Sequence, residues 1–207
     1  MQDYHQPLLP LETYHLFSRA IGEEKVFPSE KNYYYFLEKL VVHTNKVCDV
    51  YTYTLLPNHF HLVVRIKPVE NIIEEFELVK KKNFDPLKHY LPDFIMERFS
   101  NFLNSYTKSI NKMYNRKGAL FMDYLKRNKV EDDSDFTSFV FYVHKNAVHH
   151  GYTKQIGEWK FDGYNSLLSN KPTRLLRDEV LQWFGDRERF IEFHKQPIAL
   201  KTNFYDI

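Results

Sequence analysis

Two histidines separated by one residue, His59 and His61, have the clearest capacity for chemistry in this sequence. They begin a run, residues 59–66, in which every second residue is apolar: Phe60, Leu62, Val64 and Ile66. Alternate side chains of a β-strand point to opposite faces, so these four predict a buried face, and the two histidines share the other face with Val63 and Arg65. Imidazoles about 6–7 Å apart at the backbone can converge on one metal ion. Two surface or hydrogen-bonded histidines would fit the same pattern, so a third ligand is needed.

A helix predicted over residues 135–149 offers such a ligand. Its apolar stripe consists of Phe136, Val140, Val143 and Ala147. At 100° per residue, Tyr142, Asn146 and His149 fall on a different face, and Tyr142 and Asn146 are one turn apart. If this helix lies across the open face of the sheet, it brings a phenol and an amide oxygen to the ion. Most of the fifteen tyrosines are expected to be structural, so Tyr142 gains its meaning from this neighbourhood.

Composition excludes several classes of protein and site. Cys48 is the single cysteine, so the chain can form neither an intramolecular disulfide nor a thiolate zinc cluster. Hydrophobic residues make up 43% of the sequence, which argues against disorder, and the length of 207 residues allows one domain, or one domain with a small appendage. No run of 18 apolar residues occurs, and the first seven residues do not resemble a secretory signal. We therefore expect a cytoplasmic protein without a membrane partner.

The formal net charge of +2 hides a basic stretch at residues 101–130. This stretch carries seven basic side chains against one acid, Asp123, and tyrosines and phenylalanines are interleaved with them, including Tyr124. Cations mixed with aromatic rings suit phosphate contacts and base stacking, although a solvated basic face has the same composition. The candidate nucleic-acid-binding residues are Lys108, Lys112, Arg116, Lys117 and Lys126.

The elements that must position these residues follow from periodicity and turn signals. Strands are predicted over 11–18, 50–56, 59–66 and 119–130, with a hairpin at Pro57-Asn58, and helices over 29–44, 69–82, 94–114 and 135–149. This order predicts an α+β fold with a mostly antiparallel sheet covered by helices. We expect a catalytic domain over 1–151 and an ordered helical C-terminal extension over 152–207 that packs on it.

Two segments also resemble a known family. Residues 56–62, Leu-Pro-Asn-His-Phe-His-Leu, and residues 142–148, Tyr-Val-His-Lys-Asn-Ala-Val, resemble the IS200-like single-tyrosine HUH transposases, most of all the REP-associated tyrosine transposases. In that branch the helix usually reads Tyr-x-x-x-Asn-Pro-Val, and Ala147 replaces the proline here. The resemblance spans roughly residues 12–168 and implies a ferredoxin-like HUH-type domain.

The resemblance implies a DNA transposase that binds single-stranded or hairpin DNA. Tyr142 would be the nucleophile, and its attack on a phosphodiester would leave a 5′-phosphotyrosine and a free 3′-hydroxyl. His59, His61 and Asn146 would hold a divalent ion, Mg²⁺ or Mn²⁺ by resemblance, although imidazoles also favour other transition metals. His149 shares the face of Tyr142 and is a possible accessory residue.

Two other functions fit the same residues. A domesticated family member would bind structured nucleic acid without cutting it, and a metal-dependent phosphodiesterase would attack with water instead of Tyr142. The chain could act as a homodimer or as a monomer, and the tyrosine helix could serve its own histidine pair or that of a partner.

Overall fold

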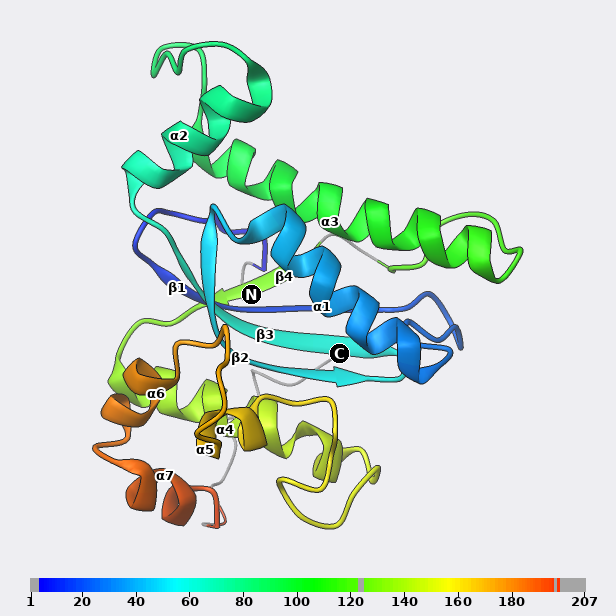
Figure 1. Cartoon of the computed structure of the whole chain (residues 1–207), viewed down its shortest axis with the longest axis vertical. Coiled ribbons are helices and arrows are strands. Elements are labelled where there is room, and N and C mark those ends of the chain that lie inside the picture. Colours follow the sequence, from blue (N-terminus) through cyan, green and yellow to red (C-terminus); the bar gives the residue numbers. More distant parts are fainter. Residues whose placement is uncertain (1–3, 123–124, 196, 198–207) are drawn as a thin grey trace.

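A four-stranded antiparallel sheet forms the centre of the computed structural model, which describes residues 4–122, 125–195 and 197. Its strand order is β2 (Cys48–Leu56), β3 (His59–Ile66), β1 (Thr13–Arg19) and β4 (Lys126–Lys129). Both inner strands lie next to two neighbours, and helices cover both faces (Figure 1). The α+β class and the antiparallel sheet predicted from the sequence are confirmed.

The hairpin of β2 and β3 turns at Pro57-Asn58, where Leu56 pairs with His59. Along β3 the predicted alternation is observed. Phe60, Leu62, Val64 and Ile66 belong to one hydrophobic core, whereas Val63 belongs to a second core on the opposite face. The two histidines therefore lie on the face of the sheet that carries this second core.

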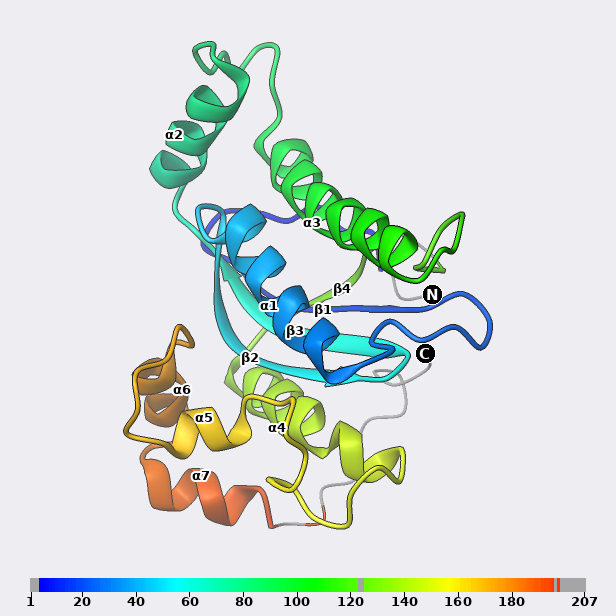
Figure 2. The same ribbon diagram turned by 45° about the vertical axis from the view of Figure 1, so that its right-hand side comes forward.

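The first core lies between the sheet and two long helices, α1 (Glu30–Thr44) and α3 (Leu91–Met113). Phe36 of α1 packs against Phe60 of the sheet and against Phe102 of α3. A shorter helix, α2 (Val69–Lys80), contacts α3 and lies at one end of the molecule (Figure 2). Helix α3 begins three residues earlier than predicted because Pro92 is well suited to a first helical turn.

Helix α4 (Asp133–His149) crosses the other face of the sheet over β2 and β3 (Figure 1). An Asp132 carboxylate oxygen caps its start by accepting a hydrogen bond from the Asp135 amide at 2.8 Å. Behind α4 lie three short helices: α5 (Tyr164–Leu168), α6 (Arg177–Trp183) and α7 (Arg187–Phe193). Because α4 lies between the sheet and this layer, its apolar stripe and the face that carries Tyr142 are both buried. The sequence pattern did not anticipate this two-sided burial.

Residues 161–163 extend the sheet beyond β2. The Leu55 amide donates to the Phe161 carbonyl at 2.9 Å, and the Gly163 amide donates to the Tyr53 carbonyl at 2.8 Å. The segment therefore covers the outer edge of β2. Asp162, between these two bonds, is buried: one carboxylate oxygen accepts from the Tyr164 amide at 3.1 Å, and the other has no hydrogen-bond partner in the described part of the chain.

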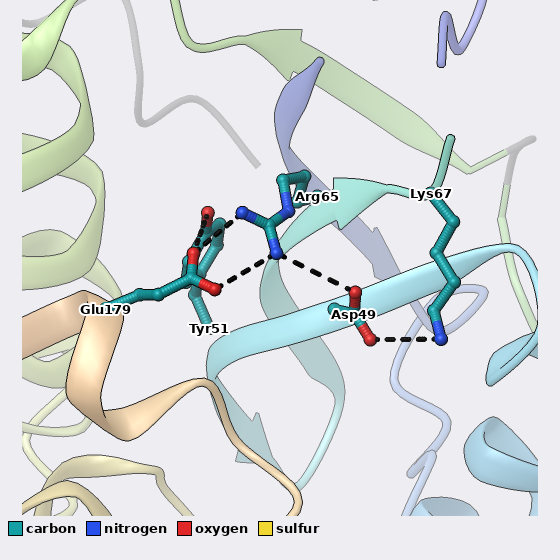
Figure 3. Close-up of polar contacts among 5 residues, drawn as sticks. All are labelled: Asp49, Tyr51, Arg65, Lys67 and Glu179. Atoms are coloured by element: carbon teal, nitrogen blue, oxygen red, sulfur yellow. Dashed lines mark hydrogen bonds and ion pairs between the residues drawn. The ribbon is translucent and has the colours of Figure 1, made fainter. Parts of the chain in front are cut away.

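An ion-pair network attaches α6 to the sheet (Figure 3). The Arg65 guanidinium donates two hydrogen bonds to the Glu179 carboxylate, at 2.7 and 3.1 Å. The nitrogen that makes the longer bond also lies 3.9 Å from Asp49, which in turn pairs with Lys67 at 3.2 Å. Tyr51 donates to the same Glu179 at 3.2 Å. At the end of β3, on the face that carries the histidines, these half-exposed ion pairs thus hold the C-terminal extension against the sheet.

The strand predicted over 119–130 is too long. Strand β4 covers only Lys126–Lys129, and Phe121 makes a single isolated bridge to Ala20. Three consecutive apolar residues, 120–122, do not suit a strand with two unlike faces, and they are respectively buried, half-buried and exposed. Asp123 and Tyr124, like residues 198–207 of the predicted extension, lie outside the described residues.

Candidate active site

His59 and His61 lie side by side on the face of β3 that α4 covers, with ring centroids 5.3 Å apart. Both side chains are buried. Burial lowers the pKa of His59 to about 4 and that of His61 well below 6.5, because a charged imidazolium loses its hydration there. Both rings are therefore neutral at pH 7, and each keeps a lone pair that can bind a cation.

Asn146 of α4 reaches His59 from above the sheet. Its Oδ1 lies 3.0 Å from His59 Nε2, while His59 Nδ1 lies 2.8 Å from Asn58 Oδ1. A neutral imidazole has one N–H, so it can donate to only one of these two oxygens. With both amides as placed, its other nitrogen faces an oxygen with lone pair against lone pair, which either a turned amide or a cation between them would relieve.

The Asn146 amide has one unsatisfied polar atom. As placed, its Nδ2 is buried without a hydrogen-bond partner among the described residues. Turning the amide would let Nδ2 donate to His59 Nε2 and would place Oδ1 where Nδ2 now lies.

His61 has one nitrogen bound and one unbound. Its Nδ1 lies 2.9 Å from Nε2 of His15, and its Nε2 has no hydrogen-bond partner in the described part of the chain. No group of three or more His, Cys, Asp or Glu side chains in the described ranges could hold a metal ion. Two imidazoles and an amide oxygen are thus the donors that this face offers, and they fit a divalent ion.

Tyr142 points its ring toward the histidines. The centroid lies 5.3 Å from that of His61 with nearly perpendicular planes (88°), and 5.9 Å from that of His15. Sequence analysis predicted this convergence of Tyr142 with the pair. The tyrosine is also only 2% exposed, so a large substrate reaches its hydroxyl only after the side chain or α4 has moved.

Two histidines beside the pair were missed as site residues. His15 faces the site because β1 and β3 are antiparallel neighbours, with His15 opposite Val63. His150, one residue after α4, places its ring 4.7 Å from that of His59. The predicted accessory residue His149 is exposed, and its ring lies 5.1 Å from that of His150. The number of histidines in the sequence could not show that His15 and His150 lie beside the pair whereas His149 is exposed.

The candidate DNA-binding cations are distributed over both layers. Lys108 and Lys112 are exposed on α3, across the sheet from α4 (Figure 1), and Lys117 is exposed in the following loop. The Arg116 guanidinium binds Glu24 at 3.1 Å, the Asn111 side chain and the Ala119 carbonyl, so it holds its own loop together. Lys126 lies on β4, with its ammonium 5.8 Å from the ring centroid of Tyr4.

Another basic feature lies on the outer side of α4. A cavity of about 530 Å³ opens between α4, the loop at 154–156 and the end of α7. Three lysines line it, Lys145, Lys154 and Lys195, and none of the described residues in its lining is acidic. Lys195 pairs with Glu192 at 3.3 Å, on the α7 side. This cavity is therefore a positive region on the α4 side of the sheet, separate from the exposed lysines of α3.

Comparison with known proteins finds a solved structure with a similar fold. No family model and no curated protein matches the sequence. A solved structure of a REP-associated tyrosine transposase bound to a REP hairpin superposes with a TM-score of 0.60 and 12% sequence identity, covering 83% of this chain and 89% of that chain. The chain shares the fold of a REP-associated tyrosine transposase. At the level of fold, this confirms the resemblance inferred from the sequence.

The fold shared with the REP-associated transposase structure covers more than four-fifths of this chain. No helix in the described part of the chain has both the length and the apolar character needed to cross a membrane.

Proposed function

We propose that this protein is a single-stranded DNA transesterase of the single-tyrosine HUH transposase type. One observation carries the proposal: Tyr142, His61 and the contact of His59 with Asn146 occupy one face of the sheet. The fold shared with a hairpin-bound REP-associated tyrosine transposase supports it.

In this proposal His59, His61 and Asn146 hold a divalent ion, Mg²⁺ or Mn²⁺. The ion would polarise the scissile phosphate and offset the negative charge that develops during attack. The neutral imidazoles, and the Asn146 side-chain oxygen beside His59 Nε2, support this ligand set. The mixed nitrogen and oxygen donors favour Mn²⁺ over Mg²⁺, because magnesium prefers oxygen ligands.

Tyr142 supplies the nucleophile. Its phenolic oxygen forms a bond to phosphorus while the bond from phosphorus to the 3′-oxygen breaks, and the phenolic proton is balanced by the proton gained at the 3′-oxygen. The products are a 5′-phosphotyrosine and a free 3′-hydroxyl. The reverse reaction with another 3′-hydroxyl joins DNA without an external energy source.

The proposed partner is hairpin or single-stranded DNA, and the exposed lysines are the proposed phosphate contacts. Each phosphate contact to a single strand contributes about 0.7 to the slope of log K against log salt concentration. Replacing both Lys145 and Lys154 by Gln should therefore reduce the slope by about 1.4 if both contact phosphates. The double variant of Lys108 and Lys112 on α3 gives the matched measurement for the opposite layer.

A covalent-adduct assay tests the catalytic proposal. The protein is incubated with end-labelled hairpin DNA and Mn²⁺, and the adduct is separated on a denaturing gel. We expect an adduct with the unmodified protein and with Tyr152→Phe, an exposed tyrosine control, and none with Tyr142→Phe or His59→Ala.

Two outcomes would contradict the proposal. Cleavage that survives Tyr142→Phe but requires His59 would identify a phosphodiesterase that uses water. Tight hairpin binding without cleavage or adduct under any metal condition would identify a non-cleaving binding module. Circular dichroism of each variant establishes that the fold is retained.

A further inference from the structure

His15, a fully buried histidine outside the proposed ligand set, contacts His61, one of the proposed metal ligands. His15 Nε2 lies 2.9 Å from His61 Nδ1, and the two rings are nearly parallel at 12° with centroids 5.1 Å apart. Aromatic rings surround His15: Phe17 at 5.0 Å and Phe139 at 4.9 Å between centroids. An imidazole in such a place loses its hydration, which costs free energy that an apolar ring would not cost. A specific role for the imidazole would explain its presence.

The contact restricts the proton positions of both rings. One of the two facing nitrogens must carry the proton, because two lone pairs would repel and two N–H groups would collide. If His15 donates, the remaining proton of neutral His61 lies on Nε2, which then cannot bind a cation. If His61 donates from Nδ1, its Nε2 presents a lone pair toward the side of His59 and Tyr142.

We propose that His15 is a positioning residue that accepts the Nδ1–H of His61 and so holds the ring with Nε2 free to bind the ion. The inference rests on the proposed metal site. His15 itself touches neither the ion nor the DNA. Partners of this kind fix the tautomer and orientation of a metal-binding histidine, and their loss typically weakens metal affinity about 10–100-fold.

Because His15 lies among aromatic rings, its hydrogen-bonding capacity can be changed with little change in packing. His15→Phe removes the acceptor but keeps a ring between Phe17 and Phe139. His15→Gln restores a side-chain oxygen that can accept the His61 proton. His61→Ala, which removes this proposed ligand altogether, serves as the reference for its complete loss. Mn²⁺ affinity is measured without DNA, by titration with electron paramagnetic resonance detection of free Mn²⁺, and thermal unfolding is followed in parallel.

We expect His15→Phe to bind Mn²⁺ about 10–100-fold more weakly than the unmodified protein, with His15→Gln intermediate. The melting temperature of His15→Phe should stay near that of the unmodified protein. The change removes the acceptor for His61, but it also removes His15 Nδ1, a buried atom without a hydrogen-bond partner in the described ranges, and the two effects offset each other. A purely structural His15 would instead lose stability and leave affinity intact.

Failure of the inference can be told apart from failure of the proposed function. If the unmodified protein and His15→Phe bind Mn²⁺ equally well, and His61→Ala does not bind, the metal site stands and the role of His15 is refuted. If the unmodified protein itself binds no Mn²⁺, the proposed site and the inference fall together. If His15→Phe does not fold, His15→Gln decides: its affinity must lie below that of the unmodified protein and above that of His61→Ala.

Discussion

Asp162 should make the protein less stable as pH rises, and replacing it by Asn should remove that effect. Burial raises the pKa of its carboxyl from 3.8 to about 7, and only one of its two oxygens accepts a hydrogen bond from the described residues. Asn keeps the oxygen that accepts from the Tyr164 amide, and it stays neutral at every pH. The comparison therefore isolates the cost of ionising one buried carboxyl.

The sign and size follow from the two pKa values. A group whose pKa is raised by folding contributes stability that is complete below the unfolded pKa and is lost as pH rises through the folded pKa. A shift of about three units corresponds to about 4 kcal/mol, of which about 2.5 kcal/mol is lost between pH 5 and pH 8. The stability of Asp162→Asn relative to the unmodified protein should therefore rise by about 2.5 kcal/mol over this interval.

Urea unfolding at pH 5, 6, 7 and 8 measures this difference. Buried histidines affect both proteins equally, so their contributions cancel. Asp178→Asn, which changes an exposed carboxylate on α6, is the matched control and should give a nearly constant difference. A difference for Asp162→Asn that is equally flat would refute the reasoning, because it would mean that the carboxyl is hydrated or paired in the native state.

Three further predictions concern the extension. Burial lowers the pKa of His194 to about 4, so its contribution of about 3 kcal/mol should be complete above pH 6.5 and lost toward pH 4; His194→Leu should flatten this dependence in urea unfolding. Phe190→Ala should cost about 3–5 kcal/mol in the free energy of unfolding, because the ring is fully buried; a smaller loss than 1 kcal/mol would mean that this core is loosely packed. Glu179→Gln should cost at most about 1 kcal/mol, since its pair with Arg65 is half-exposed; a double-mutant cycle with Arg65→Gln measures the coupling.

Local patterns predicted much of the site. Alternation in residues 59–66 placed both histidines on the face opposite Phe60, and helical periodicity placed Tyr142 and Asn146 one turn apart. These inferences needed only the geometry of single elements. The antiparallel sheet followed from the order of strands and helices and the short turn at Pro57-Asn58.

Contacts set by tertiary arrangement could not be predicted in this way. The approach of His15 to His61 depends on the register of β1 against β3, which neither strand encodes alone. Arg116 pairs with Glu24, an acid far away in the sequence, so its composition suggested a free cation. The burial of Tyr142 depends on the docking of α4 against the sheet, where its ring meets His61 and His15 from two strands.

The two-sided packing of α4 constrains any exchange of this helix between two copies of the chain. On its outer side, His144 Nδ1 lies 2.8 Å from His194 Nε2, and Phe141 packs against Phe193. On its inner side, the Thr54 hydroxyl donates to the Val143 carbonyl at 2.5 Å. A reciprocal exchange of α4 would therefore have to re-form two sets of contacts in the neighbouring copy, with the sheet on the inner side and with the end of α7 on the outer side. An exchanged tyrosine helix would fit only between two layers that the neighbour's own α4 has left.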